Sequence, residues 1–265
     1  MHTPVTTGTV LDRILEARRA EVEHRKQVLP ETALKYGVAA ATPLRDFPAA
    51  LLRPGINVLA ELKPASPSRG VLREPFDPVA LATSLESAGA AALSVLTEGE
   101  FFRGTLKNLR DARKSIQIPV LRKDFIFDPW QIWETRANDA DSFLLIVAAL
   151  TDHQLSELLA LGRELKMEPL VEVHTPAELD RALAAGAKII GVNNRNLKTL
   201  DVRVETSFEL IDKIPDDCIA VSESGIRANA ELLKLREAGY DAFLIGTRLM
   251  LSPDPGAALS SLLGK

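Results

Sequence analysis

The amino-acid sequence predicts an α/β protein, a (β/α)8 TIM barrel with an N-terminal helical extension. From residue 57 onward, short apolar runs alternate with helix-length segments, and each run is apolar on both faces. Strands of that kind are buried between helices, and parallel neighbours need a crossover connection. The eight runs, in order, are NVLAEL, AALSVL, IPVLRK, SFLLIV, PLVEV, IIGVNN, CIAVS and AFLIG. Eight strand–helix repeats favour closure into a barrel over the alternative, a doubly wound open sheet.

The first 55 residues differ from the repeats that follow. A T-x-x-D start at Thr9 and Asp12 precedes a helix with one buried face. That face comprises Leu11, Ile14, Leu15, Arg18 and Val22. A second short helix is expected around Ala33, and an apolar stripe follows at Leu44, Phe47 and Leu51. Because prolines interrupt this segment, we expect residues 1–55 to pack on the barrel, so that residues 1–265 form a single domain.

Helix boundaries in the repeats are marked by caps. Four pairs place a capping side chain before a first-turn proline: Asp77-Pro78, Asp128-Pro129, Thr175-Pro176 and Asp254-Pro255. Glu178, three residues after Thr175, predicts a capping box. Three glycines and one asparagine stand where left-handed residues end helices: Gly89, Gly186, Gly239 and Asn138.

Composition excludes several classes of function. The chain has 265 residues, 46% of them hydrophobic, and a net charge of −4, so no basic surplus predicts binding to nucleic acid. No apolar run approaches the roughly 18 residues that span a bilayer, and the N-terminus lacks a signal-peptide core. Cys218 is the one cysteine, and no His/Asp/Glu grouping has metal-ligand spacing. We therefore expect a cytoplasmic protein without a metal site.

Charged side chains end five of the eight predicted strands. They are Glu61 and Lys63, then Lys123, Glu172, Asn193 with Arg195, and Glu223. Within each run they share the phase of apolar residues expected to point into the barrel, where the chemistry of such barrels takes place. Because unpaired buried charge is costly, their convergence predicts a reactive site. Arg122 and Asp124 are out of phase with Lys123 and are assigned structural roles.

Other residues near strand ends complete the predicted site. Ser224-Gly225 and Gly246-Thr247 follow the seventh and eighth strands, where this fold commonly binds phosphate. Phe102 and Phe125 follow the second and third strands and could form an aromatic wall. His174 precedes a helix start and is expected to be exposed to solvent. Trp130 and Trp133 are expected to pack in the helical shell.

The sequence resembles the indole-3-glycerol phosphate synthase family of tryptophan biosynthesis along essentially its whole length. The motifs that carry the resemblance are AELKPASPSRG, SVLTEGEFFRG, LRKDFIFDPWQI, PLVEVHT, IGVNNRNL, SESGI and AFLIGTRLM. The resemblance implies a carbon–carbon lyase that closes the ring of 1-(2-carboxyphenylamino)-1-deoxyribulose 5-phosphate. Carbon dioxide and water are lost, and indole-3-glycerol phosphate is formed.

The resemblance also implies roles for individual residues. Lys123 would be the general acid and Glu172 the general base, with Lys63 as an anion contact or second acid. Glu61 would orient the lysines, and Glu223 and Asn193 would complete the catalytic group. The implied substrate contacts are Ser66, Asn193 and Arg195 for carboxylate and hydroxyls, Ser224, Gly225, Gly246 and Thr247 for phosphate, and Phe102, Phe125 and Leu197 for the ring. No cofactor is implied, the one partner is the phosphorylated anthranilate–ribulose adduct, and a monomer is expected.

Two alternatives stay open on sequence. One is a phosphate-binding barrel resembling phosphoribosylanthranilate isomerase, whose chemistry uses a cysteine and an aspartate at strand ends. Cys218, however, begins its predicted strand. The other is a barrel that binds sugar phosphates without catalysis, which would be expected to lack the Lys123/Glu172 pair.

Overall fold

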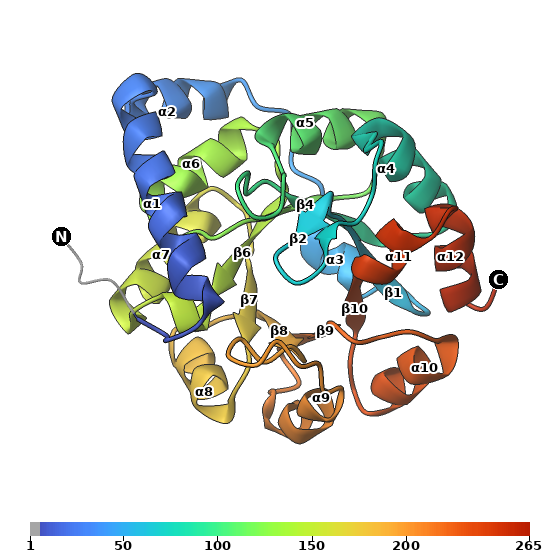
Figure 1. Ribbon diagram of the computed structural model, residues 1–265. Helices are drawn as coiled ribbons and strands as arrows, with labels where there is room; N and C mark the ends of the chain where they lie inside the picture. The colour runs from blue at the N-terminus through green and yellow to red at the C-terminus, as the bar shows by residue number, and fades with distance from the viewer. Residues whose placement is uncertain (1–5) are drawn as a thin grey trace.

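The computed structural model describes residues 6–265 and contains a closed barrel of eight parallel strands (Figure 1). Around the barrel the order is β1-β10-β9-β8-β7-β6-β5-β4. The strands are β1 (Asn57–Leu62), β4 (Ala92–Leu96), β5 (Val120–Lys123), β6 (Ser142–Ile146), β7 (Leu170–Val173), β8 (Ile189–Asn193), β9 (Ile219–Glu223) and β10 (Ala242–Ile245). Each predicted run corresponds to one strand, with β9 extending one residue beyond its run to Glu223, so the predicted barrel class is confirmed.

Helices surround the strands, as Figure 1 shows. The helices that follow barrel strands are α4 (Pro78–Ser87), α5 (Leu106–Ser115), α6 (Pro129–Ala137), α7 (Asp152–Glu164), α8 (Pro176–Ala184), α9 (Glu205–Leu210), α10 (Asn229–Glu237), α11 (Thr247–Leu251) and α12 (Pro255–Leu262). A two-stranded hairpin, β2 (Ala65–Ser66) with β3 (Gly70–Val71), follows β1 and was not predicted. No helix among residues 6–265 is long and apolar enough to cross a membrane.

The predicted caps form, with two corrections. All four side chains before the first-turn prolines accept hydrogen bonds from helix N–H groups. Glu178 does not complete a box with Thr175, because its Oε2 accepts from the backbone N–H of His174 at 2.8 Å. Asn138 is not left-handed, since its φ is −101°, and the next residue, Asp139, takes φ 64° instead. The side chain of Asn138 donates to the carbonyl of Glu134 at 2.8 Å.

Two apolar layers fill the structure. The inner layer occupies the barrel interior with inward residues of most strands, including Leu59, Leu121 and Leu170. The outer layer lies between the strands and the ring of helices. Helix α3 (Phe47–Leu51) adds Phe47 and Leu51 to the inner layer. Because the interior is packed, polar chemistry is left to the end where the strands terminate.

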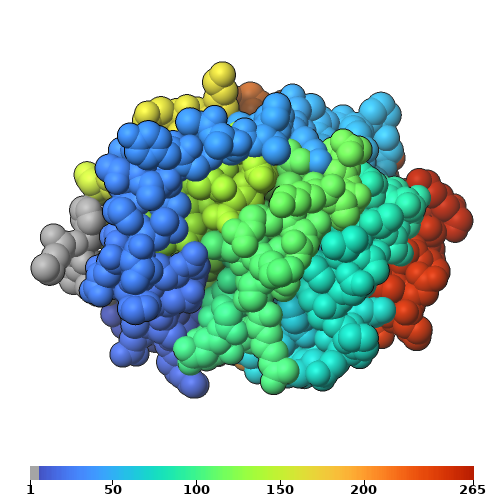
Figure 2. All heavy atoms as spheres, turned by 90° about the horizontal axis from the view of Figure 1, so that it is seen from above, coloured from blue at the N-terminus to red at the C-terminus, as the bar shows by residue number. Residues whose placement is uncertain are grey.

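The N-terminal segment packs on the barrel. Helix α1 (Val10–Val28) buries the predicted face, and α2 (Glu31–Ala39) lies against α6. Figure 2 shows this blue segment along the outside of the molecule, beside the green helices. Val22 and Leu34 pack on Trp130, whose Nε1 donates to the carbonyl of Leu29 at 2.9 Å. The predicted packing role of Trp130 is confirmed, with the extension as its partner.

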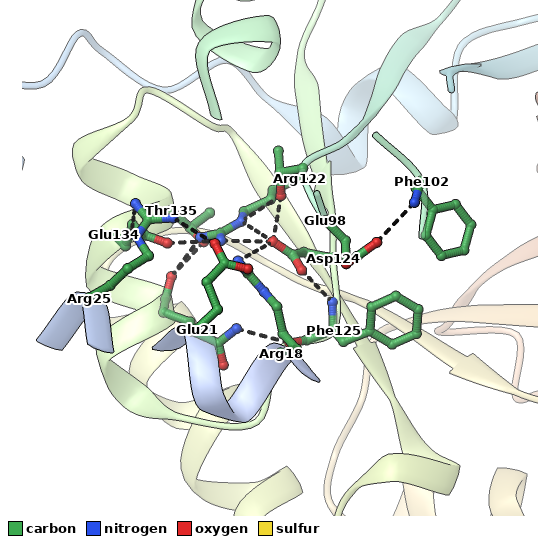
Figure 3. A network of polar contacts seen from close by, with 12 residues as sticks. Arg18, Glu21, Arg25, Glu98, Phe102, Arg122, Asp124, Phe125, Glu134 and Thr135 are labelled. Atoms are coloured by element: carbon green, nitrogen blue, oxygen red, sulfur yellow. Dashed lines mark hydrogen bonds and ion pairs between the residues drawn. The ribbon is translucent and has the colours of Figure 1, made fainter. Parts of the chain in front are cut away.

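A buried charge network ties α1 to β5 (Figure 3). Arg18 is 1% exposed and donates to Asp124 Oδ2 at 2.8 Å, and Arg122 donates to the same oxygen at 2.8 Å. Arg122 also donates to Glu134 Oε2 at 2.8 Å. These charges point between strand and helices, which confirms the structural assignment of Arg122 and Asp124. Since Asp124 follows Lys123 directly, the network fixes the end of β5.

Replacing Arg18 with methionine should destabilise the protein by about 2–4 kcal/mol, because it leaves Asp124 and Glu21 without their shared guanidinium. The matched control is Arg13→Met on the exposed side of the same helix, which should change the free energy of unfolding by less than about 0.5 kcal/mol. Denaturant unfolding measures both. Equal stability of the two variants would contradict a structural role for the network.

Candidate active site

A cavity of about 380 Å³ opens where the barrel strands end. It is bounded by the strand ends, the β2–β3 hairpin, the loops after β4, β5, β8, β9 and β10, and the start of α1. Its lining includes every site residue singled out in the sequence: Glu61, Lys63, Ser66, Phe102, Lys123, Phe125, Glu172, Asn193, Arg195, Leu197, Glu223, Ser224, Gly225, Gly246 and Thr247. The strand geometry thus brings these side chains to one chamber, and their roles remain predictions.

Lys123 stands at the centre of the charged group. Its Nζ lies 2.7 Å from Glu172 Oε2 and 3.2 Å from Glu223 Oε2. Burial alone lowers the pKa of Lys123, but the carboxylates of Glu172, Glu223 and Glu61 outweigh it and raise the pKa well above the usual lysine value. Lys123 is therefore a charged ammonium at neutral pH.

Glu172 is held in its ionised form. Burial alone raises its pKa, but Lys123 and the neighbouring His174 outweigh burial and hold the pKa well below the usual carboxyl range. One carboxylate oxygen faces Lys123, and the other lies 3.3 Å from His174 Nε2. A charged, fixed carboxylate in a buried chamber can accept a proton from a substrate carbon.

Glu223 behaves differently although it shares Lys123. Burial, and then the nearby charges of Glu172 and Glu61, raise its pKa to about 7 against the opposing effect of Lys123. Its Oε1 is buried and has no hydrogen-bond partner among the described residues. That oxygen lies over Gly191, where any Cβ would collide with it. Glu223 thus keeps its proton to a higher pH than an ordinary carboxyl group does.

Glu61 and Lys63 form a close ion pair on β1 and the segment after it. A Cβ at Gly246 would collide with Glu61 Oε2. Gly246 was predicted as a phosphate contact, and its lack of a side chain makes room for Glu61 as well. The residue is not in the left-handed region, since its φ is −125°.

Aromatic and aliphatic side chains form one wall of the cavity. Phe102 and Phe125 contact each other with ring centroids 5.9 Å apart and ring planes tilted by 40°. Their backbone N–H groups donate to Glu98 at 3.0 Å and to Asp124 at 2.8 Å (Figure 3). Leu197 and residues from the first turns of α1 add to the lining. This wall suits a planar apolar ring.

Four arginines also line the cavity. Arg195 donates to the carbonyl of Leu200 at 2.9 Å, and burial, then the adjacent Arg69, lower its pKa. Arg69, Arg227 and Arg248 also line the cavity, although the sequence did not single them out. Within residues 6–265 none of these four guanidinium groups forms an ion pair with a carboxylate. Their positions after strand ends are the feature of the sequence that could have identified them as site residues. Guanidinium groups without a carboxylate partner can bind anions.

Smaller polar groups complete the surface. The hydroxyl of Ser66 is buried without a hydrogen-bond partner in the described part of the chain. Asn193 accepts from the backbone N–H of Arg195 at 3.0 Å, which leaves its amide N–H groups for other partners. Ser224 and Gly225 take φ values of 68° and 88°, so the turn after β9 is left-handed at both residues. Thr247 begins α11.

The expected exposure of His174 is wrong. Its side chain is 8% exposed, with Nδ1 3.1 Å from Glu178 Oε2 and Nε2 near Glu172. Burial alone lowers the pKa of His174, but the two carboxylates raise it to about 9. The local sequence suggested only a helix start, because Glu178 was assigned to a cap.

Comparisons with known proteins agree with the resemblance seen in the sequence. The sequence model of one family, described as indole-3-glycerol phosphate synthase, matches residues 11–262. Proteins of that name from Rhodococcus jostii and from Mycobacterium sp. (strain KMS) are 50% and 48% identical over 255 and 259 residues. The alignments cover 96% and 98% of this chain and 95% of each relative.

Among solved structures, 3-hexulose-6-phosphate synthase superposes with a TM-score of 0.64 at 13% identity, over 79% of this chain and 99% of that chain. Mandelate oxidase with benzoyl-formic acid gives a TM-score of 0.60 at 16% identity, over 89% of this chain and 82% of that chain. At these identities the likeness establishes the fold alone.

The raised pKa of Glu223 predicts a pH dependence of stability. A carboxyl whose folded pKa exceeds its unfolded value stabilises the fold at low pH, and that contribution is lost as pH rises through about 7. Glu223→Gln should therefore be more stable than the parent at pH 8 by roughly 1–3 kcal/mol and lose this advantage at pH 5. Denaturant unfolding at both pH values measures it, with the exposed Glu237→Gln as control. A pH-independent difference would contradict the prediction.

Proposed function

Since this chain belongs to the indole-3-glycerol phosphate synthase family, we propose that Lys123 is the general acid and Glu172 the general base of its reaction. The enzyme is a lyase of tryptophan biosynthesis. It closes the ring of 1-(2-carboxyphenylamino)-1-deoxyribulose 5-phosphate to form indole-3-glycerol phosphate, carbon dioxide and water. The observation that carries the assignment is the contact of 2.7 Å between Lys123 Nζ and Glu172 Oε2 in the cavity.

The first step forms a carbon–carbon bond. The ring carbon that bears the carboxylate attacks the ketone, whose oxygen gains negative charge and takes a proton from the Lys123 ammonium. The carboxylate then leaves as carbon dioxide, and its bonding electrons restore the aromatic ring. Holding ring and ketone together removes much of the entropic cost of this attack. Phe102 and Phe125, which contact each other, supply a wall for the ring.

The second step removes water. The new hydroxyl takes a proton from an acid, for which Lys63 is the candidate, and leaves as water; Glu172 takes the proton from the adjacent carbon, whose C–H electrons form the indole double bond. Lys63 is an anion contact and a candidate second acid, held by Glu61. Glu223, with a pKa of about 7, can exchange a proton with the neighbouring Lys123.

We assign substrate binding to residues that line the cavity around Lys123 and Glu172. We assign the carboxylate and hydroxyls to Ser66, Asn193 and Arg195, with Leu197 beside the ring. The phosphate is assigned to the left-handed turn at Ser224-Gly225 and to the Gly246-Thr247 segment, where Arg227 and Arg248 add positive charge. Backbone N–H groups and guanidiniums are the usual phosphate ligands.

We further propose that the enzyme acts as a cytoplasmic monomer. One chain supplies a cavity with acid, base, aromatic wall and arginines, so the site is complete without a second copy. The single cysteine, Cys218, directly precedes β9 and is therefore at the end of that strand remote from Glu223. A free thiol is compatible with a reducing compartment.

Lys123→Met and Glu172→Gln should each lower kcat by about 10²–10⁴-fold, as loss of a proton-transfer group typically does. The assay incubates the purified protein with the carboxyphenylamino-deoxyribulose phosphate and follows indole fluorescence. Surface controls of matched chemistry are Lys114→Met and Glu164→Gln, which should keep parental turnover. Near-normal turnover in both site variants would rule out the assigned mechanism.

Arg195→Gln should chiefly weaken substrate binding and raise KM by roughly 10–100-fold, because a charge-assisted hydrogen bond is lost. Arg203→Gln, on an exposed residue after the same strand, is the control. Steady-state kinetics with the same substrate separate KM from kcat. An unchanged KM would mean that the anion contact lies elsewhere.

A further inference from the structure

His174 lies directly beside the proposed base but outside the cavity lining. It is two residues after Glu172, so in an extended chain the two side chains point to the same side. Nδ1 hydrogen-bonds Glu178 Oε2 at 3.1 Å, whereas Nε2 lies at ion-pair distance, 3.3 Å, from Glu172 Oε1 and has no hydrogen-bond partner among the described residues. The backbone N–H of His174 also donates to that Glu178 oxygen, at 2.8 Å. The ring is thus held between two carboxylates.

This arrangement favours the imidazolium form of His174. A neutral imidazole has one N–H and can donate to one carboxylate, whereas the imidazolium can donate to both. Burial alone lowers the pKa of His174, and Glu172 and Glu178 together raise it to about 9. At neutral pH the ring therefore brings a positive charge to the back of the site.

The other charged groups around this pair are themselves engaged. On the far side of Glu172, Lys123 of β5 contacts Glu172 and Glu223 of β9. Along α8, Arg181 donates to Asp152 of α7 at 2.6 Å and to the carbonyl of Leu150. Glu172 and Glu178 are therefore the groups that set the charge of His174.

A charged His174 has a consequence for Glu172. Its two oxygens face two different cations, Lys123 on Oε2 and His174 on Oε1. When Lys123 gives its proton to the substrate, its positive charge is lost, but that of His174 remains. The carboxylate then stays ionised and oriented for the second step. The same charge disfavours transfer of the Lys123 proton to Glu172 before the substrate receives it.

We propose that His174 is a positioning residue, which holds Glu172 in its ionised form and in a fixed orientation through the chain Glu178–His174–Glu172. The inference rests on the role of Glu172 as base. It assigns His174 no contact with substrate.

The kinetic test is the pH profile of kcat for the parent and His174→Gln. Glutamine can hydrogen-bond but carries no charge, so kcat should fall by roughly 10–100-fold with KM changed less than about 3-fold. The parent should lose activity as pH rises through about 9, where the imidazolium deprotonates. His174→Gln should lack this alkaline limb, and its acid limb should move to higher pH. A profile of unchanged shape would overturn the proposal, because a merely structural residue would change only the plateau.

The spectroscopic test needs no substrate. NMR of ¹⁵N-histidine-labelled protein should show both ring nitrogens of His174 protonated at neutral pH, with a titration near pH 9. In Glu178→Gln, which keeps the ring, the midpoint should drop by at least about one pH unit. His24→Gln removes an exposed histidine and should leave the His174 signals and turnover unchanged. A neutral His174 ring at neutral pH would overturn the proposal.

Glu172→Gln separates this inference from the proposed function. If that variant keeps parental turnover, the base assignment fails, and the role given to His174 fails with it. If Glu172→Gln is inactive while His174→Gln retains the parental pH profile, only the role of His174 is lost. Should His174→Gln not fold, Glu178→Gln carries the same kinetic and spectroscopic measurements.

Discussion

The site depends on one buried interaction, the ammonium of Lys123 between the carboxylates of Glu172 and Glu223. Charges taken out of water are tolerated only when they compensate one another closely. The barrel satisfies this requirement because β5, β7 and β9 deliver their inward side chains at the same height. Space is the second requirement, and it explains Gly191 and Gly246, where a Cβ would collide with Glu223 and Glu61. The glycine of β8 and the glycine that follows β10 therefore leave the space that the buried carboxyl groups of the site occupy.

Strand β5 separates structural charge from reactive charge by the alternation of its side chains. Lys123 faces the cavity, whereas Arg122 and Asp124 face the helices and meet Arg18 and Glu134 there (Figure 3). The N-terminal extension is thus bound to the residues that flank the proposed acid. A strand buried on both sides allows this division, because each side has its own compensating partners. The alternation of side chains at the end of β5 therefore both binds α1 and directs Lys123 into the cavity.

The fold and the chamber could be predicted from the sequence because both follow from periodicity. Lys123, Glu172 and Glu223 each sit in the inward phase at the end of an apolar run, and that pattern is local. The charge states could not be predicted, since the raised pKa of Glu223 depends first on its burial and then on the charges of Glu172 and Glu61 on other strands. His174 was misjudged for the same reason. Its neighbours along the chain suggest a solvated turn, whereas its burial depends on how Glu172 and Glu178 face it across that turn.

The charges of the cavity are consistent with the substrate orientation that we propose. The inner chamber holds the carboxyl groups of Glu61, Glu172 and Glu223 beside Lys63 and Lys123, and His174 lies between Glu172 and Glu178. On the proposed assignments, the arginines that form no ion pair with a carboxylate among residues 6–265, Arg195 among them, attract the anionic groups of the substrate. The proposed substrate carries a carboxylate and a phosphate, and the reaction expels the first as carbon dioxide. One anion contact is then left empty while the phosphate contact stays filled, which weakens binding of the product relative to the substrate. On the proposed assignments, decarboxylation itself therefore favours release of the product from the barrel.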